Sequence, residues 1–223
     1  MHQTKSKKIL VYIFLFLIIG TLNNKDLKKI EIKKINQINV SGLSEEKNFE
    51  VSKSLNTYKF YNLFFLNKVK IDQLISSYDH IENYSVFKRY PSSLIVQLNE
   101  TNYLAHVNQN GKNFYLGSNG KLIKAENNNK KLPNIFGNLD LNEFFKLKKT
   151  IDESNYNFYE IESLFFFPSK RWDIEMASGV LIKLPKKRLK ESFNLSLEIL
   201  NDKNFKNIKV IDVRQEKQIV INE

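Results

Sequence analysis

The chain has 223 residues, of which 42% are hydrophobic and 13% aromatic, with 7 Gly and 4 Pro, a composition that excludes a fibrous or largely disordered protein. Its net charge of +11 would suit a nucleic-acid binder, but residues 1–34 hold eight Lys against Asp26 and Glu31, so +6 lies there. No basic stripe with aromatic or glycine partners follows, and we therefore expect no nucleic acid as a partner.

An apolar segment at residues 9–22 follows a short basic tail at residues 1–8. It carries no charge, and a basic start before an apolar stretch is typical of a secretory signal. On length alone the run is shorter than a spanning helix of about 20 residues and favours a cleaved signal. Residues 23–26 lack the small-x-small pattern needed for cleavage, so we expect an uncleaved membrane anchor.

The orientation follows from the length of chain on each side of the anchor. Long domains translocate largely regardless of flanking charge. We therefore expect residues 1–8 inside the cytoplasm and a linker at residues 23–34 outside it, followed by the rest of the chain. This is a single-pass type II topology.

Residues 35–101 are predicted to form a module of order β-α-α-β-β. Ser44 is a candidate N-cap, because Glu45 and Glu46 behind it complement the positive end of a helix. Ile71 and Ile75 lie on one apolar face of a second helix. The expected elements are a strand over 35–40, helices over 45–55 and 71–78, and strands over 84–90 and 94–98.

Residues 102–223 are predicted to form a mixed, β-rich module with two helices, so that the fold class of the chain is α+β. The pairs Asn110-Gly111 and Asn119-Gly120 favour tight turns and predict a three-stranded meander. The expected elements are strands over 103–108, 113–116 and 122–123, a helix over 141–151, strands over 158–167, 172–176 and 180–184, a helix over 188–200, and strands over 208–213 and 218–222.

The sequence predicts no catalytic, cofactor or metal site. His2, His80 and His106 lack the paired spacing of metal ligands. Residues 117–120 lack the spacing of a nucleophile elbow or a phosphate loop, and we expect a turn there. The carboxylate pairs at residues 152–153 and 160–162 are expected to be solvated. We therefore expect neither an enzyme nor a protein with a small-molecule substrate.

Three motifs, in order along the two modules, carry a family resemblance. The first motif is a hairpin over residues 86–100, with Tyr-Pro before its turn. The second is a hairpin over residues 171–184 that begins with Arg-Trp. The third, residues 211–214, reads Ile-Asp-Val-Arg. Together they resemble the FtsQ/DivIB family of bacterial cell-division proteins, with the first module similar to its POTRA domain. The sequence departs from the family pattern at Thr101, where Arg and Pro usually follow the hairpin, and at Pro185, which replaces a Gly.

The resemblance implies a non-enzymatic scaffold of the divisome, with no cofactor, in the inner membrane at the division septum. It would link early and late division proteins and help to recruit and regulate septal peptidoglycan synthesis. The implied partners are bitopic proteins of the FtsB/FtsL (DivIC/FtsL) type and other divisome membrane proteins. The alternative is a periplasmic chaperone-like or substrate-binding POTRA protein.

The resemblance also implies where the partner binds: an extended segment would add to the edge of the strand at 218–222. Arg214 would anchor a partner carboxylate, although it could instead pair with Asp212 or Glu216 and only stabilise the turn. In the first module the contact candidates are Lys88, Arg89 and Tyr90, of which Tyr90 could simply shape the turn. The full set at the last strand is Arg214, Gln215, Lys217, Ile219, Val220 and Ile221.

Overall fold

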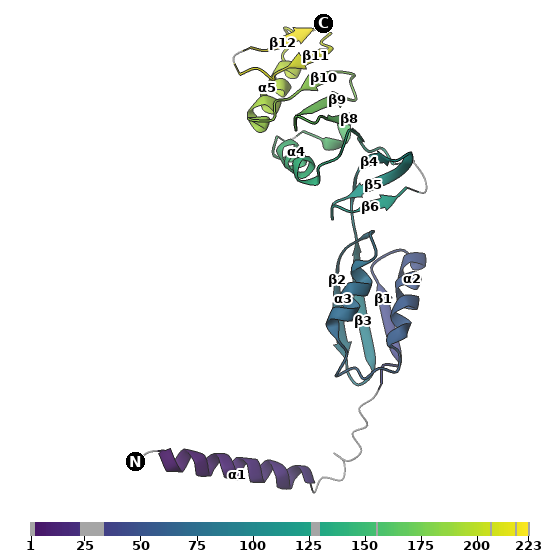
Figure 1. The fold of residues 1–223 in the computed structure, drawn as a ribbon, viewed down its shortest axis with the longest axis vertical. Coiled ribbons are helices and arrows are strands. Elements are labelled where there is room, and N and C mark those ends of the chain that lie inside the picture. The colour runs from purple at the N-terminus through teal and green to yellow at the C-terminus, as the bar shows by residue number, and fades with distance from the viewer. Residues whose placement is uncertain are drawn as a thin grey trace. The chain divides into compact units, whose positions relative to one another are not determined.

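The computed structural model describes residues 3–22, 34–125, 130–154, 156–205, 207–216 and 218–222. Contacts between residues divide the chain into two units. The first comprises Met1–Ile75 and Ser85–Gln97, and the second comprises Ser76–Tyr84 and Leu98–Glu223. Figure 1 shows the elements of each unit.

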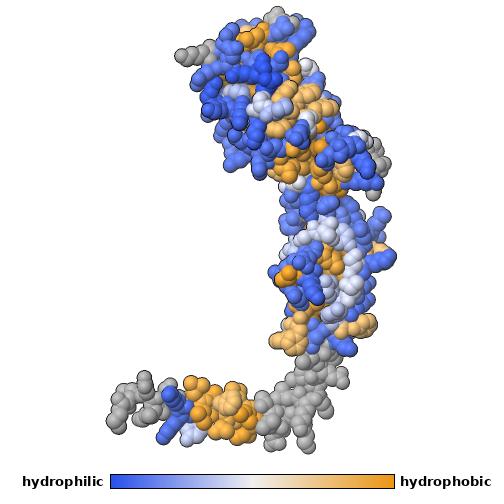
Figure 2. Space-filling model, in the orientation of Figure 1, coloured by the Kyte–Doolittle hydropathy of each residue, from blue (hydrophilic) through white to orange (hydrophobic). Residues whose placement is uncertain are grey.

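The predicted anchor lies in helix α1, Gln3–Leu22, which is hydrophobic over much of its length (Figure 2). The helix begins six residues before the apolar segment, because Lys and Gln have good helix propensity and continue it through the basic tail. Within the described ranges, no helix combines the length and the apolar character needed to cross a membrane. The predicted linker lies outside the described residues, apart from Lys34.

The β-α-α-β-β order predicted for the first module is present. Its elements are β1 Gln37–Ser41, α2 Glu45–Leu55, the 3-10 turn η2 Asn56–Tyr58, α3 Lys68–Ser76, β2 Ile81–Arg89 and β3 Ser93–Glu100. The strand order is β1-β3-β2, with β1 parallel to β3. Ser44 is the N-cap of α2, as predicted. Helix α3 begins earlier than predicted, where the side chain of Asn67 accepts a hydrogen bond from the backbone N–H of Val69 at 2.9 Å.

The two helices of this module pack on one face of the three-stranded sheet (Figure 1). Its core is built from apolar residues at helical spacing on α2 and α3 and at alternate positions on β3. These fully buried side chains are Val51, Leu55, Ile71, Ile75, Leu94 and Val96.

Residues 76–84 belong to the second unit because the turn after β5 holds them. Asn119 donates hydrogen bonds through Nδ2 to the carbonyl oxygens of Asp79 and Ile81, at 2.8 and 3.0 Å. Ser118 donates to the carboxylate of Glu82 at 2.8 Å. The turn predicted at residues 117–120 is present, with Gly120 at φ 76°, and its side chains bond a second segment of the chain.

The second unit is built on one sheet whose described strands run in the order β12-β11-β10-β9-β8-β7-β4-β5-β6. Helices α4 and α5 pack side by side against it (Figure 1). The elements are β4 Tyr103–Gln109, β5 Lys112–Gly117, β6 Leu122–Lys124, β7 Asn134–Phe136, α4 Leu141–Glu153, η3 Phe158–Glu160, β8 Ile161–Phe166, β9 Trp172–Met176, β10 Leu181–Lys183, α5 Leu189–Asn201, β11 Val210–Asp212 and β12 Val220–Asn222.

Two features of this sheet differ from the prediction. Strand β7 was not expected; its three residues, too few to show alternation, pair in parallel with both β4 and β8. The strand expected over 158–167 begins instead with a 3-10 turn, because Asn157 accepts a hydrogen bond from the backbone N–H of Tyr159 and starts that turn. The predicted meander of β4, β5 and β6 is confirmed as antiparallel.

Candidate partner-binding edge

Strand β12 is the outermost strand at one end of the described sheet. It pairs with β11 in antiparallel register, with Ile211 opposite Ile221 and Asp212 opposite Val220. Ile221 packs against the core of the second unit, whereas Val220 is 48% exposed. On its outer side no strand of the described chain pairs with β12, so its backbone groups there are open to a partner.

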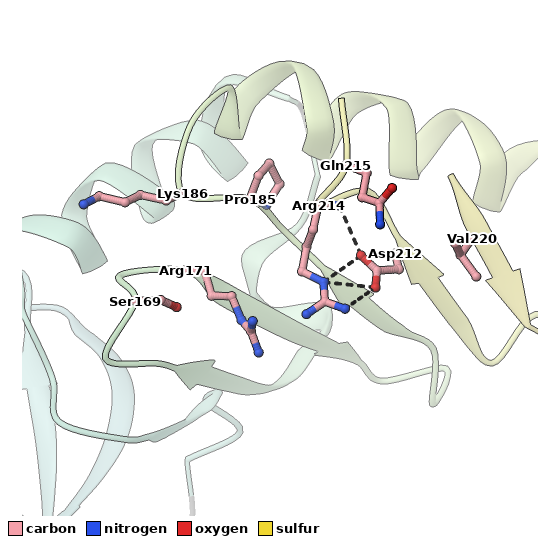
Figure 3. A pocket seen from close by; sticks show the side chains of 8 residues that line it. All are labelled: Ser169, Arg171, Pro185, Lys186, Asp212, Arg214, Gln215 and Val220. Carbon is pink, nitrogen blue, oxygen red and sulfur yellow. Dashed lines mark hydrogen bonds and ion pairs between the residues drawn. The ribbon is translucent and has the colours of Figure 1, made fainter. Parts of the chain in front are cut away.

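Arg214 lies two residues beyond the end of β11 and is held by Asp212 (Figure 3). Its Nε donates to both carboxylate oxygens of Asp212, at 2.8 and 3.0 Å, and its Nη2 donates to Oδ2. These bonds lower the pKa of Asp212 below its ordinary value and raise the pKa of Arg214. Of the two pairings that the sequence left open, the structure contains the one with Asp212, while Glu216 lies 3.7 Å from Arg188.

A pocket of about 430 Å³ opens beside Val220 and the Arg214–Asp212 pair. Arg171, which directly precedes β9, extends toward Arg214, whereas the side chain of Lys186, after β10, lines the pocket but points away from Arg214 (Figure 3). We call this the β12 pocket; its lining residues are Ser169, Arg171, Pro185, Lys186, Asp212, Arg214, Gln215 and Val220. Three basic side chains against one carboxylate make it net positive, so it favours an acidic group.

A buried carboxylate lies next to the β12 pocket. Asp173 is 5% exposed, and its Oδ1 lies 3.9 Å from Nε of Arg171, with neither atom hydrogen-bonded to a described residue. Burial raises the pKa of Asp173 above its ordinary value, although nearby Arg171 and Arg214 oppose the shift. The guanidinium of Arg171 lies over the ring of Phe167, 4.3 Å from its centroid, and Arg171 also lines the pocket.

The remaining predicted residues of this edge are placed differently. Ile219, directly before β12, lines a second pocket together with residues of α5 and Val213. Gln215 lines both spaces, and Lys217 lies outside the described residues. Ile219 and Ile221, two residues apart, are expected to share one face of the strand.

The three candidates of the first module lie at the end of β2. Lys88 donates through Nζ to the carbonyl oxygens of Phe64 and Leu66, both at 3.3 Å, so it stabilises the loop before α3. Arg89 and Tyr90 are exposed. The structure therefore gives Lys88 a structural role and leaves Arg89 and Tyr90 accessible.

The groups considered for chemistry form no catalytic cluster in the described residues. No set of three or more His, Asp or Glu there could hold a metal ion. Of the carboxylates predicted to be solvated, Glu160 and Glu162 are exposed. Asp152 pairs with Lys148, and Glu153 with Lys149 and Lys190. The bond from Lys190 lowers the pKa of Glu153, as an exposed ion pair does.

Two family models match the two modules. Residues 33–101 match the POTRA domain of the FtsQ type, and residues 105–214 match the C-terminal region of cell division protein FtsQ/DivIB. The chain belongs to the FtsQ/DivIB family. The resemblance drawn from the three sequence motifs is thus confirmed, and the chain is a member of a family of cell division proteins. The second match ends at Arg214, so β12 lies beyond it.

Several solved structures are similar to part of the chain. One of them is the major extracytoplasmic domain of the trans isomer of the bacterial cell division protein DivIB from Geobacillus stearothermophilus. The identity is 17% over 48% of this chain and 99% of that one, with a TM-score of 0.34. No curated protein matches the sequence.

Sequence reasoning missed Arg171 and Lys186 as members of the site. Arg171 precedes the Trp of the second hairpin motif and Lys186 follows Pro185, so both lay next to recognised positions. They line one pocket with Arg214 because β10 pairs with β9 on one side and in parallel with β11 on the other. That parallel pairing cannot be read from local patterns.

Proposed function

We propose that this member of the FtsQ/DivIB family is a non-enzymatic scaffold of the divisome that captures an extended segment of a bitopic FtsB/FtsL-type partner. Through that partner it would link early to late division proteins and help to recruit and regulate septal peptidoglycan synthesis. The open outer edge of β12 carries the proposal. A partner strand would gain backbone hydrogen bonds along that edge, as in other cases of strand addition.

The β12 pocket supports a preference for an acidic partner. Arg214 has five N–H groups, and its bonds to Asp212 use only Nε and Nη2. Its Nη1 group remains for a carboxylate of the added strand, together with Arg171. The Asp212 bond would hold Arg214 in place, which reduces the side-chain entropy lost when the partner binds.

A proline substitution in β12 tests strand addition. Val220→Pro removes a backbone N–H and disturbs the strand, so capture of an FtsB/FtsL-type partner should be lost. Val220→Ala keeps the N–H and is the matched control; it should retain most of the binding. Binding is measured by titration calorimetry after circular dichroism shows that both variants are folded. Unchanged affinity in a folded Val220→Pro variant contradicts strand addition at this edge.

We further propose that residues 9–22 anchor the chain in the inner membrane, with the bulk of the chain in the periplasm and enriched at the septum. The absence of charge in the segment and of a cleavage pattern after it supports this. Chain extracted from membranes should have the intact mass of the uncleaved protein. A mature form that begins after about residue 22 would contradict the anchor.

A further inference from the structure

A loop of the first unit exposes aromatic side chains and buries its leucines. It runs over residues 59–66, between η2 and α3, and we call it the aromatic loop. Phe60 and Phe65 are each 74% exposed, and Tyr61 and Phe64 are also exposed. Four exposed aromatic residues within six consecutive positions of the sequence indicate a binding surface, since such side chains are usually buried.

The aromatic loop is fixed by its neighbours rather than loosely placed. Leu63 and Leu66 are buried beneath it. Ile35 donates a backbone hydrogen bond to Tyr61 and accepts one from Phe60, both at 2.9 Å. Lys88 adds the two bonds to loop carbonyls described above. The loop is therefore held with its aromatic rings outward.

Because Ile35 is bonded to Phe60 and Tyr61, the aromatic loop lies beside the residues at which the chain coming from α1 enters the first unit. Residues 23–33 are the only residues between α1 and Lys34, a tether of about 40 Å when fully extended. If α1 is in a bilayer, the aromatic loop is restrained to the space close to that bilayer. Figure 2 shows hydrophobic residues at this end of the first unit.

The charged residues next to the aromatic loop in the sequence are lysines. Residues 34–37 and 56–70 contain Lys34, Lys59, Lys68 and Lys70 and no acidic residue, and Lys34, Lys68 and Lys70 are exposed. Aromatic rings among lysines suit the interface of a bilayer with anionic headgroups, where the rings sit at headgroup level and each Lys adds electrostatic attraction.

We propose that the aromatic loop docks on the surface of an anionic lipid bilayer, with Phe60, Phe64 and Phe65 at headgroup depth and the lysines on the lipid phosphates. This rests on the proposed anchoring of residues 9–22. Docking would hold the POTRA module against the membrane and set the distance from the bilayer at which it contacts other division proteins.

The full chain, reconstituted into vesicles, can report docking through single nitroxide labels, because it has no native Cys. Labels are placed by Phe65→Cys in the aromatic loop, by Glu46→Cys at the opposite end of α2, and by Phe14→Cys in α1. Vesicles are phosphatidylcholine alone or with phosphatidylglycerol. Collision of each label with O₂, which concentrates in lipid, is compared with collision with a water-soluble nickel chelate.

The Phe65 label should prefer O₂ over the chelate in anionic vesicles, and the Glu46 label should not. Phe60→Ser with Phe64→Ser, or Lys68→Glu with Lys70→Glu, should abolish that preference. Phe49→Ser, which removes an exposed phenylalanine on α2 away from the loop, should leave it unchanged.

The three labels separate the two proposals. If the Phe14 label lies in the bilayer but the Phe65 label stays in water in anionic vesicles, docking is wrong and anchoring stands. An aromatic loop that binds a protein partner instead of lipid would also leave the Phe65 label in water, and this result likewise contradicts docking. If the Phe14 label stays in water, anchoring fails and the docking inference fails with it. A preference of the Phe65 label for O₂ that survives the lysine reversals contradicts recognition of anionic headgroups.

Discussion

At the scale of single residues, two aspartates near the β12 pocket have opposite electrostatic environments. Asp212 accepts a forked set of bonds from Arg214, which lowers its pKa. Asp173 is buried, which raises its pKa. The ionised form of Asp212 therefore stabilises the fold at neutral pH, whereas that of Asp173 opposes it.

Neutralising each aspartate should change the free energy of unfolding in opposite directions. A carboxyl with a lowered folded pKa contributes stability above its unfolded pKa of about 4 and loses it as the pH falls through the folded pKa. Asp212→Asn should thus lower the free energy of unfolding by about 1 kcal/mol at pH 7, since the pair is partly exposed. Asp173→Asn should raise it at pH 7. Both differences should shrink as the pH falls below 4.

Urea unfolding of the two variants and the parent chain at pH 7 and pH 3 measures these differences. If Asp173→Asn destabilises the chain at pH 7, then Asp173 is held by Arg171 more strongly than it is penalised by burial. Such a result would also mean that Arg171 is not available to a partner.

At the scale of elements, the hairpin of β2 and β3 offers a second contact. We propose that Arg89 and Tyr90 at its end bind other divisome membrane proteins, because both side chains are exposed there. Arg89→Glu should reduce septal localisation of a fluorescent fusion, whereas Lys124→Glu, an exposed charge reversal on β6, should not. Lys88 is left unchanged because it holds the aromatic loop. Normal localisation of Arg89→Glu would show that the turn only shapes the hairpin.

Elements with strong local signals were predictable from the sequence. Ser44 and the two glutamates behind it defined the start of α2, and the Asn-Gly pairs defined the turns of the meander. Strand β7 has three residues and gains its place from parallel neighbours far along the chain, so no local pattern reveals it. The same limit applies to the site: Arg214 was found from its motif, but the presence of Arg171 and Lys186 in the same pocket depends on strand order.

At the scale of the whole molecule, each unit presents a surface with a different chemistry. The first exposes aromatic rings among lysines, and the second exposes a strand edge beside a basic pocket. The sheet of the second unit has two outer strands in the described chain, β12 and β6. Only β12 has the pocket of Arg171, Lys186 and Arg214 beside it, so the account assigns the partner to that edge.

Photo-crosslinking in dividing cells compares the two edges directly. A benzoylphenylalanine residue replaces Val220 on β12 in one strain and Lys124 on β6 in another; both positions are exposed. Position 220 should crosslink to a bitopic FtsB/FtsL-type protein, and position 124 should not. A crosslink to that protein from position 124 but not from position 220, in chains that are folded and equally abundant, would contradict capture at the β12 edge.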